Sequence, residues 1–280
     1  MKIIRANTSG FCMGVKRAMQ MAIETGKKTA ETVYTLGPLI HNPQAIEYLK
    51  ENGVEMISEL QSVQAGNTII IRAHGVPAED FDALKNKRAH VIDATCPHVV
   101  TSQKQIKNYS DKGYHIIIVG DPEHPEIRSL QSFANNCSVI KDYEAALKIK
   151  NLDKIMVIAQ TTYNAAEFVK ISQMLKEKSE NAIVCNSICM ATSERQTEIK
   201  KLAAESDAVI IVGGKNSANT GRLAEIASEY CLNVKHIETV DELNASDYKD
   251  CKTIVVSAGA STPDFITDKV VEWLKGLNKA

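Results

Sequence analysis

The sequence predicts an α/β protein with mostly parallel sheets, assembled from a unit that repeats three times. Short β-branched apolar runs alternate with longer amphipathic stretches along the chain, which is the pattern of strands connected by helices. Several runs are apolar at consecutive positions, as is typical of strands that helices cover on both faces. The predicted strands span 68–73, 90–94, 114–120, 154–159, 208–214 and 253–259. The predicted helices include 98–111, 164–178, 191–205, 217–230 and 263–275.

The repeat is visible in the segments that follow the strands, which fall into three sets. In the first set a glycine turn leads into a polar segment: YTLGPLIHNPQ (34–44), IIIVGDPEHPE (116–126) and IIVGGKNSANTGR (210–222). In the second set a polar turn contains no cysteine: IIIRAHGVP (69–77), MVIAQTTYN (156–164) and IVVSAGASTPD (254–264). The third set ends in cysteine: IIRANTSGFC (3–12), VIDATCP (91–97) and IVCNSIC (183–189). The sets follow one another in the same order, which predicts a threefold repeat.

The cysteine spacing supports three αβα repeats of similar size. Cys12, Cys96 and Cys189 are separated by 84 and 93 residues, each close to a third of the 280-residue chain. We expect the first repeat at 13–97, the second at 98–190 and the third at 191–280, completed by the N-terminal strand within 1–12. Because parallel strands present their carboxyl ends at one edge, these strand ends are the expected ligand site.

Composition excludes several classes of protein. The chain has 33 Lys and Arg against 34 Asp and Glu, so its formal net charge of −1 argues against a nucleic-acid-binding protein. No apolar stretch is long enough for a signal peptide or a membrane span, so we expect a cytoplasmic protein without a membrane partner. In that compartment the seven cysteines are expected to be thiols or metal ligands rather than disulfides.

Three of these cysteines have the pattern of a metal centre. Cys12, Cys96 and Cys189 each stand between a predicted strand and a predicted helix, where helix N-terminal N–H groups stabilise a thiolate. Three thiolates at one axis require a cation. Structural zinc is disfavoured because it usually takes four ligands in close-spaced pairs. An iron–sulfur cluster with three cysteine ligands and one open iron fits better. The remaining cysteines (Cys137, Cys185, Cys231 and Cys251) are interpreted as small apolar residues.

The other two sets of strand ends supply polar side chains around the same axis. They are His41, His74, His124, Glu126, Thr161, Thr162, Ser217, Asn219 and Ser261. Imidazole, hydroxyl and amide donors near helix N-termini bind phosphate oxygens without many full charges. We therefore expect a phosphorylated ligand above the metal.

Nine ordered motifs give the chain a family resemblance. GFCMGVKRA, LIHNPQ, RAHGVP, DATCPHV, EHPE, QTT, SICMATSERQ, GGKNSANTGRL and SAGASTPD together resemble the 4-hydroxy-3-methylbut-2-enyl diphosphate reductase family, called LytB or IspH, over residues 3–275. The resemblance implies a trefoil of three αβα units around a central 4Fe-4S cluster. It also implies an enzyme that reductively removes an allylic hydroxyl, giving isopentenyl and dimethylallyl diphosphates in the last step of the non-mevalonate route.

The resemblance also implies roles for individual residues. Cys12, Cys96 and Cys189 match the cluster ligands, and Glu126 matches the proton donor, with Thr161 hydrogen-bonded near it and His124 beside it in the catalytic group. The diphosphate-binding positions are His41, His74, His124, Thr161, Ser217, Asn219 and Ser261, together with Ala218. Some relatives have a second serine where this chain has Ala218, so only the backbone N–H is expected to contribute there.

Two other classes of function are compatible with parts of the pattern. One is an enzyme that uses a single cysteine as nucleophile with a histidine, although it leaves two matching cysteines unexplained. The other is a non-catalytic protein that binds phosphate esters. The reductase reading instead implies a small allylic diphosphate as substrate and a reduced electron carrier, such as ferredoxin or flavodoxin, as partner.

Overall fold

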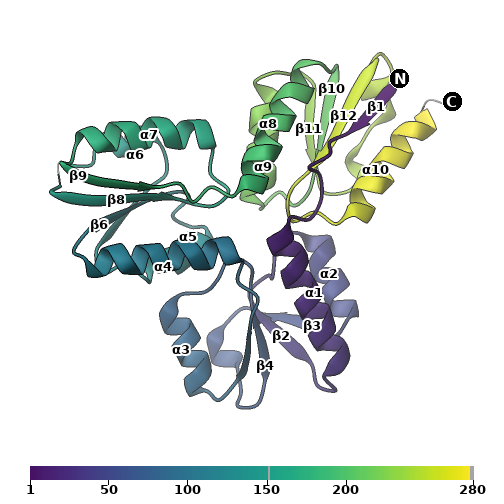
Figure 1. Ribbon diagram of the computed structural model, residues 1–280. Helices are drawn as coiled ribbons and strands as arrows, with labels where there is room; N and C mark the ends of the chain where they lie inside the picture. The colour runs from purple at the N-terminus through teal and green to yellow at the C-terminus, as the bar shows by residue number, and fades with distance from the viewer. Residues whose placement is uncertain (151, 278–280) are drawn as a thin grey trace. The chain divides into compact units, whose positions relative to one another are not determined.

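The computed structural model describes residues 1–150 and 152–277, in which parallel sheets alternate with helices (Figure 1). This part of the chain divides into two compact units. The terminal unit comprises Met1–Lys16, Ile40–Tyr48 and the described residues from Met190 onward. The central unit comprises Arg17–Leu39 and the described residues of Leu49–Cys189.

The terminal unit contains one four-stranded parallel sheet. Its strands, in spatial order, are β1 (Lys2–Arg5), β12 (Thr253–Ala258), β10 (Ala208–Val212) and β11 (Val234–Ile237). Ile3 of β1 lies opposite Ile254 of β12. The first strand of the chain therefore completes the sheet that the C-terminal third builds.

The central unit contains two further four-stranded parallel sheets. One has the order β5 (His90–Asp93), β4 (Thr68–Ile71), β2 (Val33–Leu36) and β3 (Val54–Ile57). The other has the order β9 (Asn181–Cys185), β8 (Lys154–Ala159), β6 (His115–Val119) and β7 (Cys137–Ile140). All strand pairs in the described ranges are parallel.

The three sheets share one internal order. In each sheet an edge strand leads to a cysteine, the next strand leads to a polar turn, and the third leads to a glycine turn with its polar segment. The fourth strand, β11, β3 or β7, forms the opposite edge. The sets of strand ends seen in the sequence thus occupy equivalent places in the three sheets.

Helices connect strands within each sheet and lead from one sheet to the next. Their bounds are α1 (Met13–Lys28), α2 (Pro43–Glu51), α3 (Ala78–Asn86), α4 (Pro97–Asp111), α5 (Pro125–Gln131), α6 (Tyr143–Leu147), α7 (Ala165–Glu177), α8 (Met190–Ala204), α9 (Ala218–Ser228) and α10 (Asp264–Leu277). Of these, α1, α4 and α8 each lead from an edge strand of one sheet to a strand of another. Short 3-10 turns occur at η1 (Leu60–Ser62), η2 (Val240–Glu242) and η3 (Ala245–Tyr248). Proline begins α2, α4 and α5, where its missing N–H costs no helical hydrogen bond. No helix in the described ranges is long and apolar enough to span a membrane.

Alternate residues of the strands build a separate core on each face of a sheet. In the terminal unit, Ile210 of β10 packs in a cluster with Val270 of α10. The neighbouring Val209 packs on the other face in a cluster with Ile199 of α8 and Leu223 of α9. Covering both faces by helices explains why β10 is apolar at every position. The helices on both faces hold the sheet in place, and the loops at the carboxyl ends of its strands carry the polar side chains.

The predicted α/β class with parallel sheets is confirmed, and each predicted strand and helix is found with ends shifted by a few residues. The outer edge strands β3, β7 and β11 were not predicted. Their sequences VEMI, CSVI and VKHI are short and mixed in polarity, since an edge strand need not be apolar at every position. The repeat boundaries at 97/98 and 190/191 remain a prediction.

Candidate functional site

Three cysteines have the same local environment in the three sheets. Cys12 directly precedes α1, Cys96 is the residue before α4, and Cys189 directly precedes α8. The backbone N–H of each donates to a carbonyl in the loop after the neighbouring strand. The acceptors are the oxygens of Ala260 (3.2 Å), Ala73 (2.9 Å) and Thr161 (3.0 Å), respectively. Each cysteine is therefore fixed at its backbone in an equivalent way.

The same three cysteines are partly exposed, as are Cys137, Cys185 and Cys251. These other cysteines do not stand between a strand and a helix N-terminus. Burial raises the pKa of the Cys137, Cys185 and Cys251 thiols, which favours their neutral form over a thiolate ligand. Cys231 is buried, with its sulfur near the carbonyl oxygens of Ser206 and Asn233. The donor set that fits a three-thiolate cluster is thus Cys12, Cys96 and Cys189.

In the central unit, Glu126 and Thr161 form a buried pair. The backbone N–H of Thr161 donates to Oε1 of Glu126 at 2.7 Å, and the Thr161 hydroxyl donates to Oε2 at 2.7 Å. The Glu126 side chain is 1% exposed, and burial raises its pKa to about 7, although both hydrogen bonds from Thr161 act to lower it. A carboxyl group with this pKa can hold a proton near neutral pH and release it.

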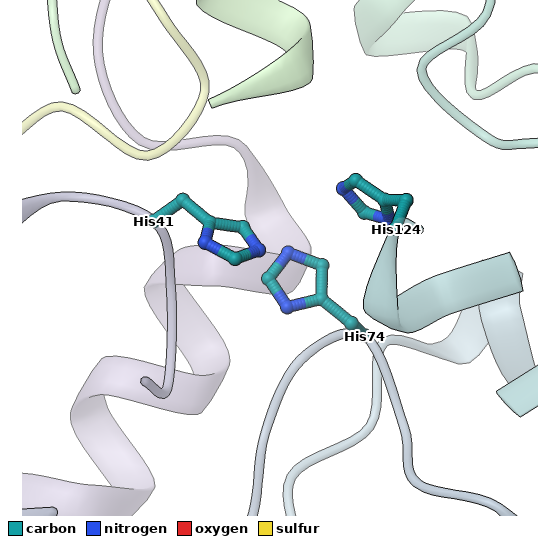
Figure 2. A group of neighbouring side chains, drawn as sticks. All are labelled: His41, His74 and His124. Carbon is teal, nitrogen blue, oxygen red and sulfur yellow. The ribbon is translucent and has the colours of Figure 1, made fainter. Parts of the chain in front are cut away.

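His124 and His74 lie beside this pair in the central unit. The backbone N–H of Glu126 donates to Nδ1 of His124 at 3.1 Å, so the neutral imidazole carries its proton on Nε2. The rings of His74 and His124 meet edge to face, with centroids 5.3 Å apart (Figure 2). His74 follows β4, the second strand from the cysteine edge of its sheet, and His124 follows β6, the third strand from the cysteine edge of the other sheet in this unit. Imidazole N–H donors are suited to an anionic ligand.

The terminal unit brings together a second polar group. The Ser261 hydroxyl lies 3.3 Å from Oγ of Ser217 and 3.4 Å from the carbonyl oxygen of His41. Ser217 caps α9, accepting from the N–H of Thr220 at 3.4 Å. A Cβ at Gly214 would lie 2.5 Å from the His41 oxygen, so a glycine is required for this close approach. Two hydroxyls and the His41 loop thus gather at the carboxyl ends of β10 and β12.

The first turn of α9 adds Ala218 and Asn219 to this group. Asn219 is 5% exposed, and its Nδ2 has no hydrogen-bond partner among the described residues. A buried amide donor without a partner is costly, and a phosphate oxygen would satisfy it. Ala218 offers only its backbone N–H at the helix N-terminus.

Asn42 was missed at the sequence level. Its side-chain oxygen accepts from the N–H of Ala45 at 2.9 Å, which caps α2 immediately after His41. The local signal was the Asn-Pro pair, since asparagine favours N-cap positions and Pro43 favours the first helical turn. Asn42 therefore fixes the direction in which the chain leaves His41.

Each unit thus carries part of the predicted site. The terminal unit joins Cys12, Ser261 and Ser217 through the carboxyl-end loops of β1, β12 and β10. The central unit connects Cys189 to Thr161, Thr161 to Glu126, and Glu126 to His124 by an unbroken series of hydrogen bonds. Chemically, these loops offer soft thiolates for a metal, neutral donors for phosphate oxygens and one carboxyl group suited to proton transfer.

The family model described as "LytB protein" matches residues 3–275, and this match decides between the classes of function that the sequence left open. The chain belongs to the LytB protein family. The resemblance inferred from the nine motifs is confirmed.

Relatives of this LytB protein match over nearly their whole length. The 4-hydroxy-3-methylbut-2-enyl diphosphate reductase of Geobacter sulfurreducens is 43% identical, covering 97% of this chain and 96% of the relative. The enzyme of the same name from Alkaliphilus oremlandii is 40% identical, covering 99% and 100%.

Two solved structures are similar to the LytB chain. One is of (E)-4-hydroxy-3-methyl-but-2-enyl diphosphate reductase, described as the terminal enzyme of the non-mevalonate pathway. It is 39% identical, with a TM-score of 0.73 over 99% of this chain and 100% of the other. The second, E-1-hydroxy-2-methyl-but-2-enyl-4-diphosphate reductase from Plasmodium falciparum, is 28% identical, with a TM-score of 0.94 over 98% and 88%. The cysteine-nucleophile and non-catalytic alternatives gain no support from these similarities.

Proposed function

We propose that the chain is a 4-hydroxy-3-methylbut-2-enyl diphosphate reductase. The reaction adds two electrons and two protons to the allylic diphosphate and releases the hydroxyl as water. The products are isopentenyl diphosphate and dimethylallyl diphosphate. Family membership and the names of relatives that match along the whole chain support this activity.

The cofactor would be one 4Fe-4S cluster held by Cys12, Cys96 and Cys189, with one open iron. When bound, such a cluster supplies electrons and a Lewis acid for the substrate oxygen. The equivalence of the three cysteine loops is the single observation that carries the proposal, because each thiol follows an edge strand and precedes a helix.

The diphosphate would be bound by neutral donors in the strand-end loops. His124 offers its Nε2–H because Nδ1 already accepts from Glu126. Ser217, Ser261 and Asn219 offer hydroxyl and amide groups at the carboxyl ends of β10 and β12. His41, His74, Thr161 and the backbone N–H of Ala218 complete the proposed set. Neutral donors suit a ligand that must leave again as a diphosphate product.

Glu126 would deliver protons to the reacting hydroxyl and carbon. Burial keeps a substantial protonated fraction near neutral pH, since its pKa is raised to about 7. Thr161 holds both carboxylate oxygens and thereby sets the direction of the group. His124 is linked to the same residue through the Glu126 backbone.

The electrons would come from a reduced carrier protein such as ferredoxin or flavodoxin, and no nucleic-acid partner is expected. A cytoplasmic location remains our prediction. The substrate itself is a small molecule.

The proposal is tested by anaerobic iron–sulfur reconstitution followed by an assay with 4-hydroxy-3-methylbut-2-enyl diphosphate and a reduced viologen dye. Cys12→Ser, Cys96→Ser and Cys189→Ser should each lose cluster integrity and turnover. Cys185→Ser is the matched control. Cys185 is close to Cys189 in the chain, but burial raises the pKa of its thiol, so this thiol should be dispensable. Turnover that survives iron chelation in the wild type would instead favour a cysteine-nucleophile enzyme.

A further inference from the structure

The loop that leads to Cys12 is longer than the other two cysteine loops. It runs through residues 6–12, between the end of β1 at Arg5 and the start of α1 at Met13. The corresponding loops are residues 94–96 after β5 and 186–189 after β9. A longer loop has more conformational freedom, so holding its cysteine in one place costs more entropy.

Helix α8 holds this loop with two charged side chains. The Glu198 carboxylate accepts from the backbone N–H groups of Asn7 (2.8 Å) and Thr8 (2.9 Å), and from the Thr8 hydroxyl (2.5 Å). One turn earlier on α8, Nη2 of Arg195 donates to the carbonyl oxygen of Gly10 at 2.5 Å. These contacts therefore hold the loop from Asn7 to Gly10, which lies two residues before Cys12.

The Arg195 contact is made in the interior. Arg195 is 5% exposed, and its Nη1 donates to the carbonyl oxygen of Ala191 in the same helix at 3.2 Å. Arginine offers a rigid fork of donors, which lysine cannot reproduce. Burying a guanidinium group costs free energy unless its N–H groups are hydrogen-bonded.

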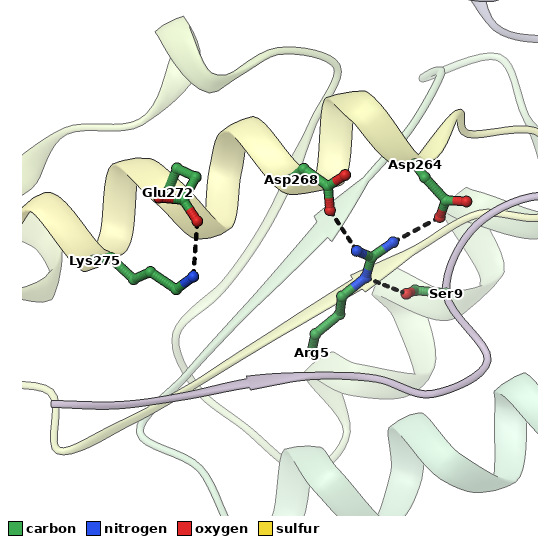
Figure 3. Close-up of polar contacts among 6 residues, drawn as sticks. All are labelled: Arg5, Ser9, Asp264, Asp268, Glu272 and Lys275. Carbon is green, nitrogen blue, oxygen red and sulfur yellow. Dashed lines mark hydrogen bonds and ion pairs between the residues drawn. The ribbon is translucent and has the colours of Figure 1, made fainter.

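A second anchor of the loop involves Arg5 and is exposed (Figure 3). Arg5 pairs with Asp264 and Asp268 of α10, and its Nε donates to the Ser9 hydroxyl at 3.1 Å. Exposed ion pairs contribute little because water and salt screen them. The buried contact from Arg195 of α8 is therefore a stronger restraint on the loop.

The central unit has a comparable contact at a second cysteine loop. Arg17 donates to the carbonyl oxygens of Thr95 (3.3 Å) and Asp93 (3.5 Å), just before Cys96. A guanidinium group on the carbonyls of a cysteine loop thus occurs in both units. Partners behind the ligands of a metal site typically set ligand orientation and retention.

From these contacts we infer that Arg195 and Glu198 are positioning residues for the Cys12 ligand, which preform its loop for the iron–sulfur cluster. The inference rests on the proposed cluster. Neither residue is one of the proposed ligands or substrate contacts. Glu198 orders the first half of the loop, and Arg195 fixes Gly10 and places a permanent positive charge near the Cys12 end.

The test compares Glu198→Gln, Arg195→Gln and Arg195→Lys with the wild type after anaerobic reconstitution. Glu194→Gln is the control, because Glu194 is an exposed residue on the same helix. The first readout is the rate of iron loss to a chelator, and we expect about a tenfold or greater acceleration in the three variants and none in the control. The second is the reduction potential of the cluster. It should become more negative in Arg195→Gln, which loses a nearby cation, and change less in Arg195→Lys.

A third readout separates positioning from general loss of stability. In the full-length chain without cluster, alkylation followed by peptide mass spectrometry compares three cysteines within one molecule. Glu198→Gln should accelerate alkylation of Cys12 relative to Cys96 and Cys189. Equal acceleration of all three cysteines would overturn the inference, as would wild-type rates of iron loss in the variants. If the wild type itself assembles no cluster, the proposed function fails instead.

Discussion

Thr161 donates two hydrogen bonds to the carboxyl group of Glu126, one from its backbone N–H and one from its hydroxyl, both at 2.7 Å. The pair joins the loop after β8 to the start of α5, because Glu126 lies in the first turn of that helix. The carbonyl of the same threonine accepts from the N–H of Cys189 at 3.0 Å. A single residue therefore positions both the proposed proton donor and the backbone of a proposed cluster ligand.

Glu126→Gln should abolish turnover while leaving cluster assembly and substrate binding largely intact. Glutamine keeps the shape of the protonated carboxyl group but has no proton to give, so a loss of roughly 10²- to 10⁴-fold in kcat is expected. Anaerobic steady-state kinetics measure it. Glu123→Gln is the control, because Glu123 is an exposed partner of Arg128. Turnover near the wild-type rate in Glu126→Gln would exclude this residue as the proton donor.

Thr161→Val should shift the pH dependence of turnover to higher pH. The hydroxyl hydrogen bond from Thr161 lowers the pKa of Glu126, so its removal should raise that pKa from its value of about 7. Because the protonated carboxyl group is the active form, the fall of kcat with rising pH should begin at higher pH. Thr161→Ser retains the hydroxyl and should keep the wild-type profile. A shift to lower pH in Thr161→Val would contradict this account.

Glu126 should also make the stability of the folded chain depend on pH. Its pKa is about 7 when folded, against an ordinary value of 4.5, so the folded state retains a proton that the unfolded state releases. Its contribution is fully present below pH 4.5 and is lost as pH rises through 7. The difference is on the order of 3 kcal/mol for a shift of this size.

The measurement is urea unfolding of the full-length chain without cluster, between pH 4.5 and pH 8. Glu126→Gln should flatten the dependence of the unfolding free energy on pH relative to the wild type. Glu123→Gln should leave the slope unchanged. If the unfolding free energy depends on pH with the same slope in wild type and Glu126→Gln, the pKa of the Glu126 carboxyl group is not raised by folding.

Gly214→Ala should weaken substrate binding more than it affects the rest of the protein. The new Cβ would lie 2.5 Å from the carbonyl oxygen of His41, so the loop after β10 or the His41 loop must move. Overpacking of this kind costs about 1–3 kcal/mol of stability, and KM for the diphosphate should rise.

Gly221→Ala is the matched control for Gly214→Ala. Gly221 lies inside α9, and outside its chain neighbours and the backbone of its own helix no described atom comes within 4 Å of the position of its added Cβ. Replacing glycine by alanine in a helix should add up to about 1 kcal/mol of stability. Kinetics and thermal unfolding of both variants check the pair. Equal KM values in wild type and Gly214→Ala would argue against a role for the contact with the His41 loop.

The sequence was sufficient for the parts of the fold that depend on local pattern. Continuous apolar runs such as AVIIV of β10 reflect burial on both faces, so the inner strands were predictable. The edge strand VKHI of β11 has no such pattern and was recognised only through its pairing with β10. The equivalent positions of Cys12, Cys96 and Cys189 after the edge strands β1, β5 and β9 were also predictable, and their role as ligands stays a prediction.

Contacts between residues far apart in the chain could not be predicted in this way. Glu198 and Thr8 are 190 residues apart, and nothing in either local sequence indicates that they meet. The carboxyl group of Glu126 is fixed by Thr161 on another strand-end loop, and only the resemblance pointed to that pair. Local pattern determines which loops carry the chemistry, whereas packing determines which side chains in those loops touch.

Mössbauer spectroscopy of anaerobically purified protein labelled with iron-57 tests the central claim most directly. Spectra are recorded with and without 4-hydroxy-3-methylbut-2-enyl diphosphate. We expect a 4Fe-4S cluster in which one iron is distinct and changes its signal when the substrate is added, since three cysteines leave one iron open. Protein that contains no cluster and cannot be reconstituted with one would contradict the account.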